Sequence, residues 1–382
     1  MSAYHQLGHE SWNLVAEAAL RGFAGVILSP VNDSPANVVL RLAKLVDQRA
    51  ALEVVLDPQF YKPTSDRGQL STWAHIGNDI DTADLGDQAW WHGRCGLLVQ
   101  AAQQVGANAV CSPALLPQVF SDGYYEQVVQ CADALQPVAA DAGMDVLLTA
   151  IVSLSEITQK GRTEQVASIL SAAKASRIYL VLHDNLYPKT QRTNLLSMTG
   201  AAKLIRLLEG SGMSVLVAFS GLDFLVWKAA GASHVATGKF LNLRRFVPGR
   251  WDDPAEGGRV IPYWTDDSLI TWLREDDLRL LDARGLMDRD AAAANPYSVE
   301  ILQIVDEAQG KPWIGLAWRQ YLYWFRQVEL EVASDPQQSM RMLIAADKRW
   351  RQIEEQQIFL FDRENTGEWI RPWLNAITMS AG

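Results

Sequence analysis

The chain has few cysteines and no long apolar run. Its 382 residues include three cysteines, Cys95, Cys111 and Cys131, and no CxxC pair, so a disulfide framework is not indicated. No window approaches the ~20 apolar residues that a membrane-spanning helix needs. The first residues lack the basic and apolar regions of a signal peptide. We therefore expect a cytoplasmic protein without a membrane span.

The chain also lacks an excess of positive charge. With 34 Lys and Arg against 44 Asp and Glu, the net charge is −10, which argues against a global electrostatic grip on nucleic acid. There is no Walker loop, no GxGxxG and no GxSxG. One local exception, the basic cluster, places four cations within a dozen positions with no carboxylate between them: Lys239, Arg244, Arg245 and Arg250.

Residues 1–240 repeat a single pattern, in which short β-branched runs alternate with amphipathic stretches. This pattern is typical of βαβ units and a parallel sheet. The runs predict strands at 3–7, 24–30, 52–58, 108–113, 144–152, 177–183, 213–220 and 233–238. The stretches between them predict helices at 11–21, 34–50, 91–105, 121–142, 163–175, 193–210 and 222–230.

The residues at the ends of these elements and the composition of the strands support the same fold. Glycines at 22, 106, 143, 212 and 231 fall between a helical pattern and the next strand, where a left-handed C-cap is common. The runs VVL, VLLTAIV and VLVAF are continuously apolar, as strands buried on both faces should be. Eight such units predict an α/β fold, a (βα)8 TIM-like barrel, with an open doubly wound sheet as the alternative.

Two segments depart from the repeat. A polar insertion at about 60–90 separates the third strand from the third helix, and its length predicts a lid at the barrel mouth or a segment packed outside. Residues 241–382 form a C-terminal helical extension, beginning with a Gly-, Pro- and Arg-rich loop. Helices are predicted there at 266–283, 297–309, 313–333 and 336–361.

The extension contains more than half of the fourteen tryptophans. Apolar residues spaced by three and four define one buried face of a helix, namely Trp313, Ala317, Tyr321, Trp324 and Val328. We expect this extension to dock on the barrel, on a protein partner or on a second copy of the chain.

Two glycine turns close the predicted seventh and eighth strands. Ser220-Gly221 precedes a short helix, and Gly238-Lys239 follows the eighth strand. Backbone amides at such turns, a helix N-terminus and a lysine together suit an anion. The stretch resembles the closing segment of phosphate-binding (βα)8 barrels, which implies a phosphate site here. Asp223 departs from that pattern, because a carboxylate in the first turn can cap the helix and repel an anion.

Polar residues at the other strand ends supply candidate chemistry, because the C-terminal ends of barrel strands face the active-site mouth. Asp57, His183 and Asp184 are the candidate catalytic residues, as an acid/base or nucleophile/acid set. Candidate substrate-binding residues are Gln6, Gln59, Asn185, Ser220, Gly221, Gly238, Lys239, Arg244 and Arg245. A metal is not favoured, since His5 and His9 lack the HxH spacing of amidohydrolase barrels, and the sequence leaves any cofactor unknown.

These observations predict a barrel enzyme acting on a phosphate-bearing substrate such as a nucleotide, a sugar phosphate or nucleic acid. Carboxylate and histidine chemistry would make it a hydrolase or a glycosyl-transfer enzyme. The alternative is a non-catalytic barrel that serves as a binding or assembly subunit through its Trp-rich helical tail.

Overall fold

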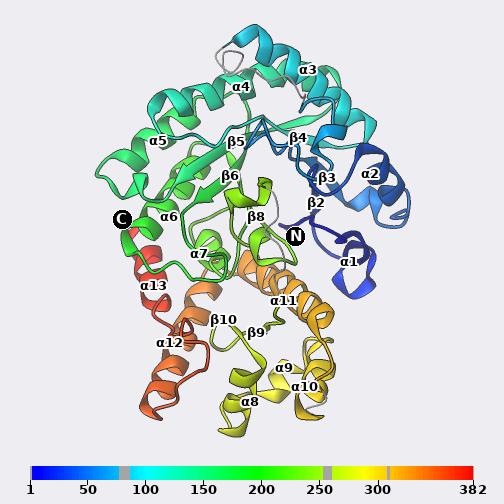
Figure 1. The fold of residues 1–382 in the computed structure, drawn as a ribbon. Helices are drawn as coiled ribbons and strands as arrows, with labels where there is room; N and C mark the ends of the chain where they lie inside the picture. Colours follow the sequence, from blue (N-terminus) through cyan, green and yellow to red (C-terminus); the bar gives the residue numbers. More distant parts are fainter. Residues whose placement is uncertain (1, 77–86, 253–259, 308–309, 382) are drawn as a thin grey trace.

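Eight parallel strands close into a barrel in the computed structural model, which describes residues 2–76, 87–252, 260–307 and 310–381 (Figure 1). The strands are β1 (Ala3–Gln6), β2 (Gly25–Leu28), β3 (Glu53–Leu56), β4 (Ala109–Cys111), β5 (Asp145–Ser153), β6 (Arg177–His183), β7 (Ser214–Val217) and β8 (His234–Thr237). Each strand pairs with the next, and β1 also pairs with β8. The predicted (βα)8 barrel is confirmed, and the open sheet is wrong.

Seven helices follow the first seven strands. They are α1 (Trp12–Ala16), α2 (Pro35–Leu42), α3 (Gln88–Gln104), α4 (Asp122–Asp141), α5 (Arg162–Leu170), α6 (Leu195–Gly210) and α7 (Phe224–Ala229). Ser34, Ser121 and Asn194 cap α2, α4 and α6, because each side chain accepts a hydrogen bond from a first-turn amide. The five predicted C-cap glycines all have positive φ, as that prediction requires.

The eighth helix of the barrel comes from much later in the chain. Helix α11 (Ile314–Ser334) packs on β1, on α7 and on the 3-10 helix that follows α1. Near its start, the Tyr321 hydroxyl lies 2.7 Å from Thr237 Oγ1 at the C-terminal end of β8. Near its end, Glu329 accepts a hydrogen bond from the Ser2 amide at the start of β1. Helix α11 therefore runs antiparallel to β8, as a barrel helix does.

The remaining C-terminal elements form a hairpin and further helices: β9 (Trp264–Asp266), β10 (Thr271–Leu273), α8 (Glu275–Ala283), α9 (Arg289–Ala292), α10 (Ser298–Glu307), α12 (Gln338–Glu355) and α13 (Ile370–Met379). The predicted helix at 266–283 is wrong in its first half. Asp266 Oδ1 accepts a hydrogen bond from the Leu269 amide at 2.9 Å, which favours a tight turn between β9 and β10 instead of a helix. The predicted helix at 336–361 ends early, at Glu355.

The C-terminal helices pack on the barrel's own helices. Helix α13 lies against α6 and α7, and α12 lies against α7 (Figure 1). The predicted apolar face of α11 is buried, and Trp324 contacts Phe224 of α7 with ring centroids 5.8 Å apart. Docking on the barrel is therefore confirmed, whereas the division of the chain at residue 240 stays a prediction. None of the helices in the described ranges is long and apolar enough to cross a membrane.

Candidate functional site

An ion pair crosses the barrel interior near the N-terminal ends of the strands, the end opposite the mouth. Arg177 of β6 donates to both carboxylate oxygens of Glu53 on β3, at 2.6 and 2.9 Å, and Tyr4 of β1 also donates to Glu53. These three strands are not neighbours in the barrel, so the three side chains must point inward. Because side chains alternate along a strand, this contact fixes which residues face the interior further up.

A second polar layer lies above the first, at the mouth. Gln6 donates to the Tyr179 hydroxyl at 2.8 Å, and Tyr179 donates to Asp57 at 3.4 Å. The Tyr61 hydroxyl lies 3.0 Å from both Asp57 oxygens, and the Gln59 amide donates to Asp57 at 2.9 Å. The predicted residues Gln6, Asp57 and Gln59 are therefore brought together inside the barrel.

Asp57 is a carboxyl group that is buried within this polar layer. It is 1% exposed, and this burial raises its pKa to about 6, although the Gln59 amide, the Tyr61 hydroxyl and the positive charge of Arg250 all oppose the rise. A carboxyl group with such a pKa exchanges its proton near neutral pH, which suits general acid–base chemistry.

Aromatic rings cover this layer and form a mouth plug made of Tyr61, Phe219, Phe246 and Trp251. The Phe246 ring centroid lies 5.2 Å from that of Tyr61, 5.3 Å from that of Phe219 and 5.4 Å from that of Trp251. All four side chains are buried. The loop that follows β8 therefore folds across the mouth and separates Asp57 from the solvent.

His183 continues the inward face of β6 and lies among aromatic rings. Its ring lies between Phe120 and the plug residue Phe246, with centroids 6.0 and 5.8 Å away. Its Nδ1 is buried without a hydrogen bond among the described residues. Burial lowers the pKa of His183, although the neighbouring Asp184 carboxylate opposes this change. A neutral imidazole is thus favoured at the mouth.

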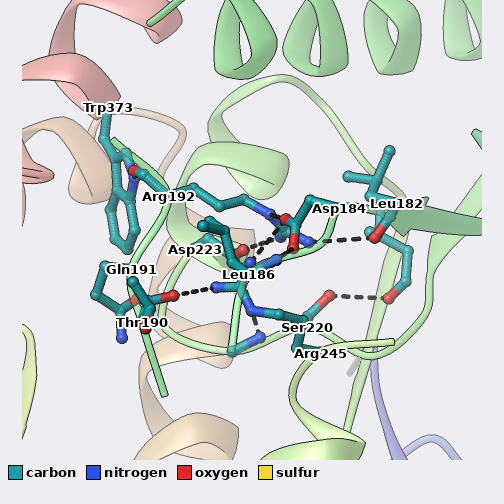
Figure 2. A network of polar contacts seen from close by, with 12 residues as sticks. Leu182, Asp184, Leu186, Thr190, Gln191, Arg192, Ser220, Asp223, Arg245 and Trp373 are labelled. Carbon is teal, nitrogen blue, oxygen red and sulfur yellow. Dashed lines mark hydrogen bonds and ion pairs between the residues drawn. The ribbon is translucent and has the colours of Figure 1, made fainter. Parts of the chain in front are cut away.

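Asp184 belongs instead to a buried network of four charges, formed with Arg192, Asp223 and Arg245. Figure 2 shows both arginines meeting at Asp184, whose Oδ2 accepts from Arg192 at 2.6 Å and from Arg245 at 2.7 Å. Arg192 also pairs with Asp223. Burial alone would raise the pKa of Asp184, but the two arginines hold it below its usual value. Asp184 is therefore a fixed anion, poorly suited to donate a proton.

The predicted phosphate turn after β7 is occupied by the chain's own carboxylate. Asp223 Oδ1 accepts a hydrogen bond from the Gly221 amide at 3.0 Å, while its other oxygen binds Arg192. The structure thus places a carboxylate where the sequence predicts a phosphate, so the Gly221 amide is not free for a ligand.

Three other predicted binding residues, Gly238, Ser220 and Asn185, pack against the chain, bond to its backbone or lie exposed on a loop. A Cβ on Gly238 would lie 2.6 Å from the Gln6 carbonyl oxygen and from Leu243 Cβ, so the glycine allows close packing and not ligand approach. The Ser220 hydroxyl donates to a carbonyl of its own strand end. Asn185 is exposed on the loop after β6.

A cleft of about 1000 Å³ lies on the outer side of the loop that follows β8. It is lined by the loops after β1, β2, β3, β6 and β8 and by the start of α11, which is the C-terminal side of the barrel. Its charged lining residues are Arg67, Lys239, Arg244, Arg250 and Asp252. Asp252 is paired with Lys62, so the cleft is predominantly cationic.

Lys239 lies in an aromatic part of this cleft. Its ammonium nitrogen is 4.4 Å from the Trp318 ring centroid and 4.7 Å from that of Phe240. Its hydrogen-bond acceptor is the Glu10 carbonyl oxygen at 3.3 Å. Burial lowers the pKa of Lys239, with the Glu10 carboxylate opposing this change.

Arg244 and Arg250 line the same cleft and are 5% and 8% exposed. Arg244 donates to the Gly238 carbonyl at 3.1 Å, and its guanidinium lies 3.3 Å from the Tyr321 ring centroid. Arg250 donates from Nη2 to Ser29 Oγ at 2.9 Å, whereas its buried Nη1 has no partner among the described residues. Burial lowers the pKa of each arginine to about 10.

These three residues, the cleft cations, share one feature. In the ranges that the structure describes, no carboxylate oxygen lies within 4.0 Å of a side-chain nitrogen of Lys239, Arg244 or Arg250, so none of them forms an ion pair there. Charged groups are seldom buried without a partner, because desolvation is costly. The cleft therefore holds positive charge that the protein itself does not neutralise by direct pairing.

Sequence reasoning missed several of these residues. Tyr179 carries no motif and becomes visible only through the inward phase of β6, whereas Tyr61 and Arg192 lie on the loops after β3 and β6, where no strand pattern applies. Arg67 lies in the long insertion at about 60–90. Residues 77–86 of this insertion lie outside the described part of the chain, so the role of the insertion as a lid stays a prediction. Arg250 did have a signal, because it belongs to the basic cluster.

A metal centre has no support from the described side chains. Nowhere among them do three or more His, Cys, Asp or Glu residues gather as a metal site requires. The three cysteines are buried and unpaired with one another.

No protein-family model and no curated protein matches the chain. Similar solved structures include a glycoside hydrolase family 3 β-N-acetylglucosaminidase from Paenibacillus sp. (15% identity, covering 63% of this chain and 54% of that chain, TM-score 0.40). Others are a class V chitinase from Pseudomonas fluorescens (11%, 56% and 67%, 0.38) and a type I 3-dehydroquinate dehydratase from Clostridium difficile (8%, 65% and 86%, 0.35). The chain spans about half the length of the Paenibacillus enzyme. At these scores the likeness agrees with the barrel and supports no inference about activity.

Proposed function

We propose that this barrel is an enzyme whose phosphate-bearing substrate binds in the cationic cleft. The observation that carries the proposal is the set of cleft cations, Lys239, Arg244 and Arg250, which are buried without a carboxylate partner in the described chain. A phosphate would supply the missing negative charge and accept charge-assisted hydrogen bonds. The buried Nη1 of Arg250, which has no hydrogen-bond partner among the described residues, would be one donor to such a ligand.

The proposed chemistry centres on Asp57. Arg250 connects the two regions, because it lines the cleft and its charge also acts on Asp57 beneath the plug. Displacement of Phe246 and Trp251 would bring a substrate held by Arg250 to this carboxyl group, which would act as general acid or base. His183 would face the same space. We propose a hydrolase or glycosyl-transfer reaction, with Asp184 kept as a structural anion.

Calorimetric titration with pyrophosphate, a sugar phosphate and a nucleotide tests the binding step. Lys239→Met is expected to weaken any phosphorylated ligand about ten-fold or more, since loss of one charge-assisted contact costs roughly 1.4 kcal/mol or above. Lys203→Met is the matched control, because Lys203 lies on α6 and pairs with Glu164 at the surface. Equal affinity of the wild type and Lys239→Met would reject the site.

The second candidate function is a non-catalytic binding barrel. It is favoured by the mouth plug, which leaves Asp57 1% exposed, and by the engagement of Asp184 with two arginines. The Trp-rich tail gives this alternative little surface, because Trp313, Trp324 and Trp373 are buried within the chain. Light scattering decides the assembly part: a monodisperse monomer counts against it, and a stable oligomer supports it.

A further inference from the structure

The cleft has an apolar wall as well as a cationic one. Tyr187, Tyr263, Val260 and Ile261 line it together with the cleft cations. Tyr187 is 70% exposed, Val260 59% and Ile261 41%, so this wall is open to the solvent. Exposed apolar groups beside a charged pocket are typical of a ligand-binding surface.

We propose that the cleft takes a nucleotide, with the phosphate on the cleft cations and the base against Tyr187 and Tyr263. This inference rests on the proposed function and specifies its substrate class. A nucleotide combines an anion with a flat aromatic ring, and stacking on tyrosine is a common way to hold a base. A sugar phosphate would satisfy the cations and leave the apolar wall exposed.

The aromatic rings of the cleft differ in how open they are to a base. Phe240 and Trp318 face the Lys239 ammonium at 4.7 and 4.4 Å, and the Tyr263 ring faces the Lys189 ammonium at 5.8 Å. Tyr187 is 70% exposed, so its ring is the main stacking surface that we propose, with Tyr263 beside it. The space of about 1000 Å³ lies at the upper end of small-molecule sites, which is large enough for a nucleotide.

The loop that carries Tyr187 is fixed before any ligand arrives. The Thr190 amide donates to the Tyr187 carbonyl at 2.9 Å, and the Leu186 amide donates to Asp184 at 3.0 Å. Arg245 also donates to the Thr190 carbonyl at 2.7 Å (Figure 2). The four-charge network thereby holds the backbone of the loop that carries Tyr187, which reduces the entropic cost of ordering this loop on binding.

The test compares adenosine 5′-monophosphate with ribose 5-phosphate by calorimetry, using the full chain. The wild type is expected to bind the nucleotide at least about ten-fold more tightly, because base stacking contributes on that scale. Tyr187→Ala is expected to lose about ten-fold for the nucleotide and to keep its affinity for ribose 5-phosphate. Phe359→Ala is the control, since Phe359 is 83% exposed and does not line the cleft.

Three outcomes overturn the inference in distinguishable ways. Equal affinity for the two ligands, or a Tyr187→Ala variant that binds the nucleotide as the wild type does, rejects the nucleotide and leaves the proposed phosphate site standing. Binding of a lysophosphatidic acid more tightly than the nucleotide assigns the apolar wall to an acyl chain. Failure of every phosphorylated ligand to bind rejects the proposed function together with the inference.

Discussion

Individual charged residues near the mouth divide into two groups with opposite environments. Arg192 and Arg245 are buried and paired with carboxylates, and the pairing offsets their desolvation. Arg244 and Arg250 are similarly buried and have no carboxylate within ion-pair distance in the described chain. Arginine is therefore paired with carboxylates at two buried positions, and at two others it is held by neutral groups.

Asp57 predicts a pH dependence of stability. Its folded pKa of about 6 lies above the ordinary value of 3.8, so its stabilising contribution is complete below pH 3.8 and is lost as the pH rises through about 6. A shift of this size corresponds to about 3 kcal/mol. Asp57→Asn does not titrate, so the wild type should lose up to that amount relative to the variant between pH 4 and 7.

Urea unfolding of both proteins across this range measures the difference. All other titrating groups are shared, so their contributions cancel to first order. Identical pH slopes for the wild type and Asp57→Asn would show that the carboxyl group titrates normally and would remove the physical basis for its acid–base role.

Single residues were only partly predictable. Asp57 could be placed at the mouth because it follows an apolar run, and Gln6 because it lies near the end of the predicted first strand. The phase of β6, which decides between His183 and Asp184, could not be fixed, since a continuously apolar strand gives no alternation. It becomes clear only when Arg177 is seen to span the barrel to Glu53.

Among the elements, α7 departs most from a phosphate-binding barrel. Asp223, the residue before its first turn, accepts a hydrogen bond from the Gly221 amide and pairs with Arg192, so a carboxylate already lies beside the turn after β7. The Asp223 carboxylate thus takes the place in which the resemblance predicts a phosphate. The cleft cations on the following loop supply the positive charge instead, while Arg245 of the basic cluster pairs with Asp184.

Removing Asp223 should expose the cost of this arrangement. Asp223→Ala leaves Arg192 with a single carboxylate partner, and breaking a buried pair typically costs about 3–5 kcal/mol. Glu164→Ala, which breaks the surface pair with Lys203, should cost about 1 kcal/mol or less. Urea unfolding checks both values, and equal losses for the two variants would contradict the structural role of Asp223.

Element boundaries were predictable wherever the periodicity changed at a glycine. The barrel strands follow the prediction to within a few residues, because their apolar runs are short and well separated. The hairpin of β9 and β10 was missed because its strands are three residues long each, too short for a period-two pattern. Helix α13 was also missed, because it lies beyond residue 361, where the last predicted helix ends.

At the scale of the whole molecule, the extension and the barrel share one core. Helix α11 closes the ring of barrel helices, and Phe224 and Trp227 of α7 are fully buried beneath the C-terminal helices and the barrel wall. The sequence suggested an appendage because the eighth helix is separated from β8 by more than seventy residues. No local pattern reveals that a distant helix fills a missing place in a repeat.

This sharing predicts that residues 1–240 do not fold alone. Without α11 the faces of β1, β8 and α7 lose their cover, including the Phe224 contact with Phe325 at 4.3 Å between centroids. The fragment should show no cooperative thermal transition by near-ultraviolet circular dichroism, whereas the full chain should show one. A cooperative transition in the fragment would establish residue 240 as a true domain boundary.

The central claim is our proposal that the cleft cations, which have no carboxylate partner in the described chain, bind a phosphate. A crystal structure of the full chain soaked in inorganic phosphate tests it most directly. The account predicts an anion within hydrogen-bond distance of Arg250 Nη1 or Lys239 Nζ, away from any neighbouring molecule. A well-ordered cleft that contains only water, or a phosphate held solely at lattice contacts, would contradict it.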